Sequence, residues 1–239
     1  MNEVISPNLD KAHVSSSPAV KERPILFSTE MVKAILEGRK TETRRLNDLG
    51  LINKNPNLWK DVWCAFYGDT NANSKTFGQA FTYAQAFGED EKTQLIKCRY
   101  GNVGDLLWVR ETYAKHPSEG ILYKATDTAK DFISENLKWK PSIFMPREVC
   151  RIVLRITEIK VERLQSINEE DAKVEGVKCD LSLEFNQYLN YEKGIYQLPS
   201  AVESYKSLWS EINGVESWNT NPYVWVIKFE VAQAEKGYC

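Results

Sequence analysis

Histidine is scarce in this chain, whose 239 residues include only His13 and His116. The scarcity excludes zinc sites of the H-E-x-x-H type, and any Ser-His-Asp triad would have to be built on His116 alone. The five cysteines are scattered and never form a C-x-x-C pair, so a disulfide framework or structural zinc site is not expected. We predict no metal and no cofactor, and a reducing cytoplasm as the simplest location.

Long apolar runs and a strong charge of one sign are also missing. No uninterrupted apolar stretch reaches the roughly 18 residues that a membrane-spanning helix needs, and the N-terminus lacks an apolar signal core. We therefore expect no membrane association. The 31 basic and 33 acidic residues nearly cancel, so affinity for nucleic acid would have to come from a local basic patch. Nothing in the sequence sets the oligomeric state.

The organisation along the chain predicts one domain with two interruptions. Residues 1–20 are polar and lack periodicity, which is typical of a disordered tail. Residues 21–234 are expected to form a single domain. Within it, weakly patterned stretches at about 49–96 and 177–203 indicate insertions, the first with short helices.

Short predicted strands outnumber predicted helices and lie far apart in the sequence. The strands are expected over residues 40–45, 106–112, 121–125, 150–161 and 223–231, and the helices over about 29–37, 168–175 and 202–212. The spacing of Ser166 and Glu169 is that of a capping box at the second helix. This arrangement favours an α+β domain built on a small barrel or curled sheet.

The densest candidate for chemistry is the basic segment 38–45. Between residues 21 and 45 there is an excess of three positive charges. Arginine and lysine at a helix-to-strand turn could hold a phosphate or a carbonyl oxygen. The alternative is a solvated charged turn, because surface charge is common.

This segment resembles the opening of ASCH-domain proteins. Their G-x-K-x-x-x-x-R signature is met by Gly38, Lys40 and Arg45. Four further blocks, at residues 104–111, 145–147, 208–214 and 221–226, resemble the longer ASCH proteins often carried by phages and prophages. The resemblance covers about residues 22–48, 97–176 and 204–232.

The resemblance implies a PUA-like β-barrel with flanking short helices and a cleft suited to RNA or a modified nucleoside. The best-understood small members are N4-acetylcytidine amidohydrolases, which use a lysine and a threonine in G-x-K-x-x-T and a later glutamate in Ala-x-x-Glu. Carried over to this chain, these residues are Lys40, Thr43 and Glu175, with Ala172 completing the last pattern.

Amide hydrolysis needs a nucleophile, a proton carrier and a positive group where the carbonyl oxygen gains charge. Thr43 could attack directly or position a water, Glu175 could carry the proton, and Lys40 could stabilise the oxyanion. Each residue also has an ordinary alternative: a strand threonine, a solvated helix-end carboxylate and an exposed lysine.

Five arginines complete the predicted site, and two other functions remain open. The expected substrate or RNA contacts are Arg39, Arg44, Arg45, Arg110 and Arg147, without an indication of whether Arg44 or Arg45 faces the cleft. One alternative is an RNA-binding module without catalysis, and the other is a ribonuclease using the same cleft. The apolar surroundings of Trp108, Trp209 and Trp225 predict core positions.

Overall fold

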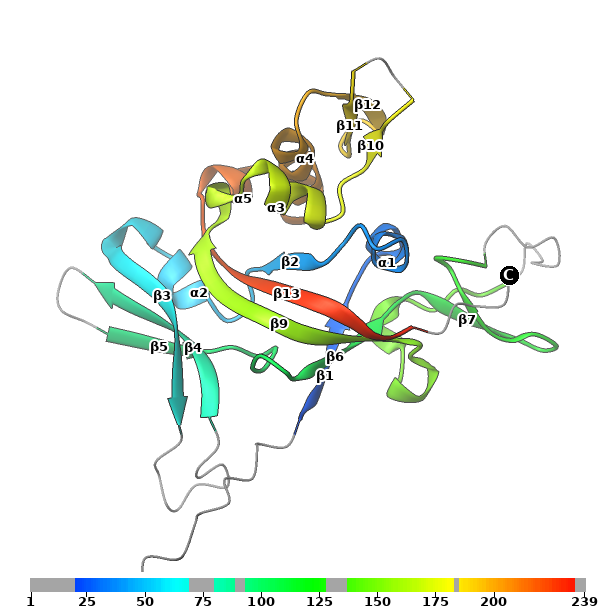
Figure 1. Cartoon of the computed structure of the whole chain (residues 1–239), viewed down its shortest axis with the longest axis horizontal. Coiled ribbons are helices and arrows are strands. Elements are labelled where there is room, and N and C mark those ends of the chain that lie inside the picture. Colours follow the sequence, from blue (N-terminus) through cyan, green and yellow to red (C-terminus); the bar gives the residue numbers. More distant parts are fainter. Residues whose placement is uncertain (1–19, 69–79, 89–92, 128–136, 183–184, 235–239) are drawn as a thin grey trace, which may run out of the picture.

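A five-stranded sheet in the order β1-β6-β9-β13-β2 forms the centre of the fold (Figure 1). Its strands are β1 (Glu22–Leu26), β2 (Glu42–Arg45), β6 (Leu106–Arg110), β9 (Ile152–Arg163) and β13 (Tyr223–Ala234). The pair β1–β6 is parallel and the other pairs are antiparallel. The structure is a computed structural model that describes residues 20–68, 80–88, 93–127, 137–182 and 185–234. The predicted tail, apart from residue 20, lies outside these ranges.

The two long strands β9 and β13 carry much of the apolar core. On β9, Ile152, Val153 and Leu154 are all buried, and the alternation expected of a strand with one face on the core begins at Leu154. The first five residues of β13 are all buried, which marks a strand covered on both faces. Trp225 and Trp209 are core residues as predicted. The expectation for Trp108 is wrong, since it is only half-buried.

The two edge strands of the sheet approach each other at the end of β2. Arg45 at this end donates a hydrogen bond from Nη2 to the carbonyl oxygen of Leu26 in β1 at 2.8 Å. Its guanidinium also lies 5.0 Å from the ring centroid of Phe27. Within the described ranges no backbone ladder joins β1 to β2. The fold is therefore α+β, with a sheet that curls and is bridged at its edges by a side chain.

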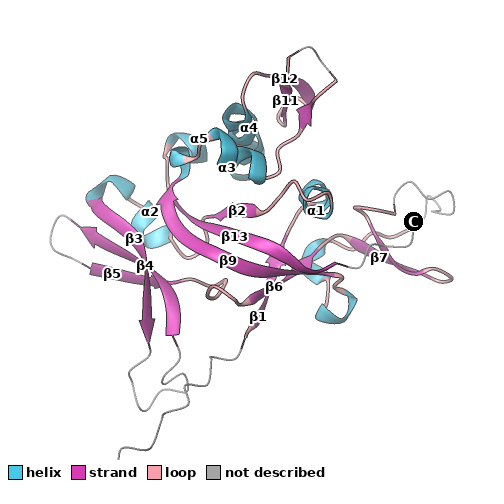
Figure 2. Cartoon of the chain, in the orientation of Figure 1, coloured by secondary structure: helices cyan, strands magenta, loops and turns pink. Residues whose placement is uncertain are grey.

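Helices lie along the β2 side of the sheet (Figure 2). They are α1 (Thr29–Leu36), α3 (Glu169–Val174), α4 (Ala201–Asn213) and α5 (Val215–Asn219). Ser28 caps α1 by accepting from the backbone N–H of Met31, as its place before the apolar periodicity predicts. The predicted capping box at α3 is wrong by two residues, because Asn168 is the cap and accepts from the N–H of Asp171 at 2.8 Å.

Both predicted insertions contain small antiparallel sheets. The first holds α2 (Gly50–Asn53), a 3-10 turn η1 (Pro56–Leu58), and strands β3 (Trp59–Gly68), β4 (Ala80–Gly88) and β5 (Thr93–Lys97). Strands, not short helices, therefore make up most of its described part. The second holds β10 (Cys179–Asp180), β11 (Gln187–Asn190) and β12 (Ile195–Leu198). The two sheets lie on different sides of the central sheet (Figure 1).

The remaining described elements lie in the connections between the central strands and include a separate two-stranded sheet. They are the hairpin β7 (Tyr113–His116) and β8 (Gly120–Tyr123), and the 3-10 turns η2 (Ser142–Phe144), η3 (Arg147–Val149) and η4 (Leu164–Ser166).

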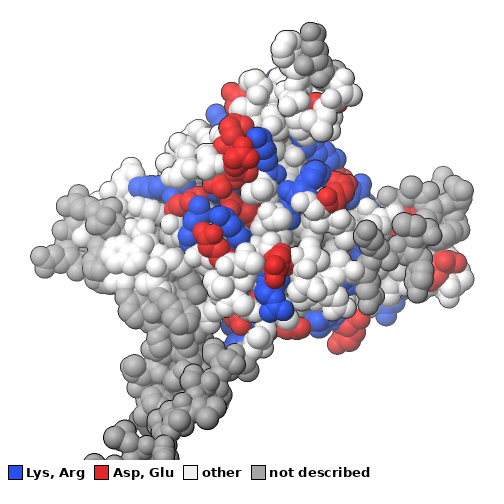
Figure 3. Space-filling view, viewed as in Figure 1, with Lys and Arg blue, Asp and Glu red and all other residues white. Residues whose placement is uncertain are grey.

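None of the helices in the described ranges has the length and apolar character needed to cross a membrane. On the face shown in Figure 3, basic and acidic side chains interleave over α3, β9 and β13.

Candidate functional site

Two distant segments of backbone meet where the predicted catalytic residues lie. Lys40 and Glu175 form an antiparallel bridge, and the N–H of Thr41 donates to the carbonyl oxygen of Val174 at 2.9 Å. Gly176 makes this approach possible. Its φ is +90°, and a Cβ there would lie 2.9 Å from the Cβ of Lys40 and 3.0 Å from that of Ala34. The turn after α3 is thus pressed against the strand that carries the basic segment.

Lys40 and Glu175 form a buried ion pair, with 2% and 3% of their surfaces exposed. The ammonium Nζ of Lys40 donates to Oε2 of Glu175 at 2.7 Å, to the Glu175 carbonyl oxygen at 2.6 Å and to the Glu42 carbonyl oxygen at 2.7 Å. An ammonium has three hydrogens, so these bonds use all of them. Burial lowers the pKa of Lys40, while the carboxylate of Glu175 opposes that shift.

Arg44 sits at the centre of four carboxylates. Its Nη1 pairs with Glu42 and lies 3.2 Å from Oε1 of Glu175, and its Nη2 lies 2.8 Å from Oε1 of Glu162 and 3.3 Å from Oδ2 of Asp171. The side chain is fully buried. Burial lowers the pKa of Arg44, but the charges of Glu175 and Glu42 outweigh it and the net shift is upward. Arg44 therefore holds strand β2, β9 and helix α3 together.

Glu42 is the least compensated member of this cluster. Its side chain is fully buried, and Oε2 has no hydrogen-bond partner among the residues that the structure describes. Burial raises the pKa of Glu42 to about 7, with Arg44 opposing the shift and the nearby charge of Glu175 adding to it. One face of the strand carries Lys40, Glu42 and Arg44 at every second position, and this spacing is visible in the sequence.

A pocket of about 200 Å³ adjoins the ion pair, and we call it the site pocket. Its lining includes Lys40, Thr43, Arg45, Glu175, Tyr205 and Trp209. The three predicted catalytic residues therefore share one pocket. Thr43 is 3% exposed, and none of the hydrogen bonds found in the described ranges engages its hydroxyl. That hydroxyl is left available to a bound molecule.

Tyr205 is a site residue that the sequence pattern did not single out. Its spacing on α4 predicts a core position, and it is indeed 3% exposed. Its ring lies 5.9 Å from the Arg44 guanidinium and it lines the site pocket. Burial, with the charge of Glu175, raises the pKa of Tyr205 well above its ordinary value, so the phenol stays protonated. In the described part of the chain its hydroxyl has no hydrogen-bond partner.

The five predicted contact arginines have different places. Arg44 and Arg45 both line the site pocket. Of these two, Arg44 is paired with carboxylates, and Arg45 has no carboxylate partner in the described residues. Arg39 donates to the carbonyl oxygen of Gly176 at 2.9 Å and supports the bridge from outside. Arg147 pairs with Glu22 at the surface at 2.8 Å, away from the site pocket. Arg110 lines a neighbouring pocket with Arg45.

No group of three histidine, cysteine or acidic side chains in the described ranges is arranged to hold a metal ion. The four carboxylates near the site surround Arg44 instead.

Comparisons with models of protein families, with curated proteins and with solved structures find no match for this chain.

Proposed function

We propose that this chain hydrolyses the amide of an acylated pyrimidine nucleoside, of the N4-acetylcytidine type. The observation that carries the proposal is the meeting of Lys40, Thr43 and Glu175 at one pocket, from segments more than 130 residues apart. An exposed lysine, a strand threonine and a solvated helix-end glutamate would have no reason to meet. The bridged, curled sheet also supports the finer proposal of a PUA-like barrel of the ASCH type.

The nucleophile in this proposal is the Thr43 hydroxyl or a water that it positions. Attack on the acyl carbon forms a carbon–oxygen bond, and the proton of the nucleophile passes to Glu175. Glu175 returns the proton to the exocyclic amine as the carbon–nitrogen bond breaks. Direct attack by Thr43 leaves an acyl ester that water then hydrolyses. The products are the free amine of the base and a carboxylic acid.

The role of Lys40 is refined by its hydrogen bonds. Because all three of its N–H groups already have acceptors, Lys40 acts on the oxyanion through its charge and on Glu175 through orientation. The direct donor to the oxyanion is assigned to the Tyr205 hydroxyl. This phenol is protonated, lines the pocket and has no partner within the described residues.

The test is release of cytidine and acetate from N4-acetylcytidine by purified protein, followed by chromatography. We expect Thr43→Val and Glu175→Gln to abolish release. The matched control is Thr41→Val, which makes the same substitution two residues away on an exposed side chain. Circular dichroism checks that each variant is folded. Full release by folded Thr43→Val and Glu175→Gln proteins would overturn the assignment.

The RNA-binding and ribonuclease functions use the same pocket and remain alternatives. Lys40 and Arg44 are unsuited to hold RNA phosphates directly, since buried carboxylates and carbonyls already occupy them. RNA cleavage by the intact protein, lost in Lys40→Ala, would favour the ribonuclease.

A reducing cytoplasm is the location that we propose. The free thiols at Cys64, Cys98, Cys150 and Cys179 are in keeping with it.

A further inference from the structure

A second pocket of about 320 Å³ adjoins the site pocket, and we call it the arginine pocket. Its polar lining consists of Arg23, Arg45, Arg99, Arg110, Asn47 and Tyr100, and among the described residues no acidic side chain lines it. The arginines come from four places in the sequence: β1, β2, the segment after β5, and the end of β6. The fold has thus gathered four guanidinium groups around one hollow.

The charges of the arginine pocket are only partly balanced. Arg23 pairs with Asp105 at 2.9 Å, and Arg99 is held by both carboxylate oxygens of Asp48. Arg45 and Arg110 have no carboxylate partner in the described ranges and donate only to backbone carbonyl oxygens. The Nε atoms of both are buried without a hydrogen-bond partner there. An anion between them would complete their coordination and balance their charge.

Two residues belong to both pockets. Arg45 and Asn47 line the arginine pocket and the site pocket, so the two hollows lie on either side of the end of β2. Asn47 is held in place because its Oδ1 accepts from the Tyr100 hydroxyl at 2.6 Å and its carbonyl oxygen accepts from Nε1 of Trp225 at 3.0 Å. The two pockets are therefore neighbours, as a ligand with a base at one end and a phosphate at the other requires.

We infer that the arginine pocket binds the phosphate of a nucleotide whose base lies in the site pocket. The inference rests on the proposed function and narrows its substrate to a phosphorylated one. Arginine suits this task because its planar fork makes two parallel hydrogen bonds to phosphate oxygens. A free mononucleotide and a terminal nucleotide of an RNA strand share this chemistry.

The test is calorimetric titration of the full chain with cytidine monophosphate and with cytidine, the dephosphorylated counterpart. We expect the monophosphate to bind at least about tenfold more tightly, since its phosphate adds charge-assisted hydrogen bonds that cytidine cannot make. Arg99→Gln and Arg110→Gln are each expected to reduce that preference by about tenfold. An oligocytidine with a terminal phosphate, titrated in parallel, shows whether a strand end also fits.

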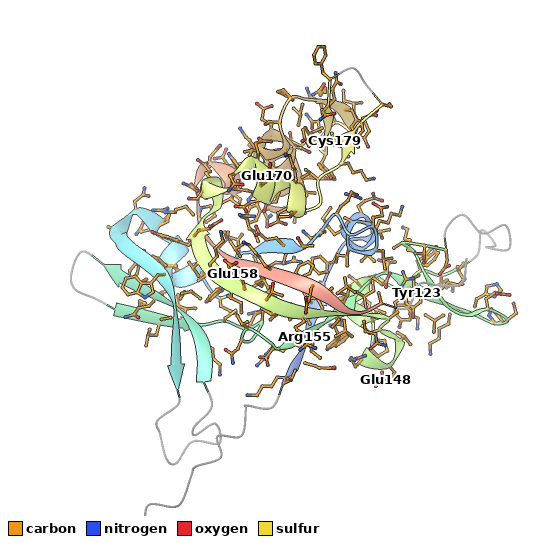
Figure 4. The ribbon with its side chains drawn as sticks, in the orientation of Figure 1. Tyr123, Glu148, Arg155, Glu158, Glu170 and Cys179 are labelled. Atoms are coloured by element: carbon orange, nitrogen blue, oxygen red, sulfur yellow. The ribbon has the colours of Figure 1, made fainter. Side chains whose placement is uncertain are left out.

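The matched control is Arg155→Gln. Arg155 is an exposed arginine paired with Glu230 at 3.6 Å, and it lies opposite Leu106, at the other end of β6 from Arg110 (Figure 4). It should leave the preference unchanged. Equal affinity for the two ligands, absent binding of the monophosphate, or a preference insensitive to Arg99 and Arg110 would each overturn the inference. Phosphate-dependent binding without hydrolysis would overturn the proposed function alone.

Discussion

The Nζ atom of Lys40 lies 2.7 Å from Oε2 of Glu175, although 135 residues separate them. The pair is buried, and its two backbones are bridged as well. A buried charge without a partner destabilises the folded protein, so each residue of the pair makes burial of the other possible. The site is therefore also part of what holds α3 against β2.

Lys40→Met should destabilise the protein by about 3 kcal/mol, because it leaves Glu175 buried with less compensation. Adding Glu175→Gln to this variant should restore part of the loss, since the two effects are coupled. The measurement is the free energy of unfolding in urea. Lys33→Met, which removes a surface pair with Glu30, is the control and should cost no more than about 1 kcal/mol. Equal losses for both lysines would contradict the prediction.

Glu42 should make stability depend on pH. Its pKa is raised from 4.5 to about 7, so between these values the folded protein keeps a proton that the unfolded chain has released. Stability from this group is present at low pH and is lost as pH rises through 7. Glu42→Gln removes this dependence, so the variant should gain stability relative to the parent from about pH 5 to about pH 8.

Urea unfolding across that pH window measures the Glu42 effect. The control is Glu158→Gln, which changes an exposed carboxylate on β9 paired with Lys228 at 3.1 Å (Figure 4). Its stability difference from the parent should stay nearly flat. A Glu42→Gln difference that stays flat across this window would contradict the prediction, because it would show that the carboxylate is ionised throughout in the folded protein.

Tyr205→Phe should separate activity from stability. The hydroxyl has no partner in the described residues, so its removal should cost less than about 1 kcal/mol. If it donates to the oxyanion, turnover of N4-acetylcytidine should fall about 100-fold. Tyr223→Phe is the control with the opposite expectation: it should lose stability and keep its turnover. The Tyr223 hydroxyl donates to the carbonyl oxygen of Trp59 at 3.2 Å, and Tyr223 lies outside the site pocket lining. Wild-type turnover by Tyr205→Phe would reassign the donor.

Gly176→Ala should disturb the site through the backbone. The new Cβ meets Lys40 and Ala34 within 3.0 Å, and φ is +90°. We expect a loss of about 2 kcal/mol or more in the free energy of unfolding. Gly194→Ala is matched for a positive φ of +71° but has open space around it, so it should cost about 1 kcal/mol from backbone strain alone. Equal losses would mean that the close contact is unimportant.

Local sequence patterns predicted the helices and strands of the domain better than they predicted which residues contact one another. Periodicity and caps placed α1 and α4 within one or two residues, because helix signals depend on near neighbours. The alternation between Lys40 and Arg45 predicted that Lys40, Glu42 and Arg44 share a strand face. The ion cluster was not predictable, since Glu162 and Asp171 reach Arg44 only through pairing of strands far apart in sequence. The same reason hid the place of Tyr205 in the lining of the site pocket.

The contact of Arg45 with Leu26 bears on whether the β1 edge of the sheet can pair with a strand of another chain. Edge strands expose unpaired backbone groups on which another chain can add a strand. Here β1 is short, contains Pro24, which lacks an N–H, and has the Leu26 carbonyl occupied by Arg45. The β1 edge is thus a poor template for intermolecular strand pairing. Arg45, which lines both pockets, is therefore also expected to disfavour the addition of a strand at this edge.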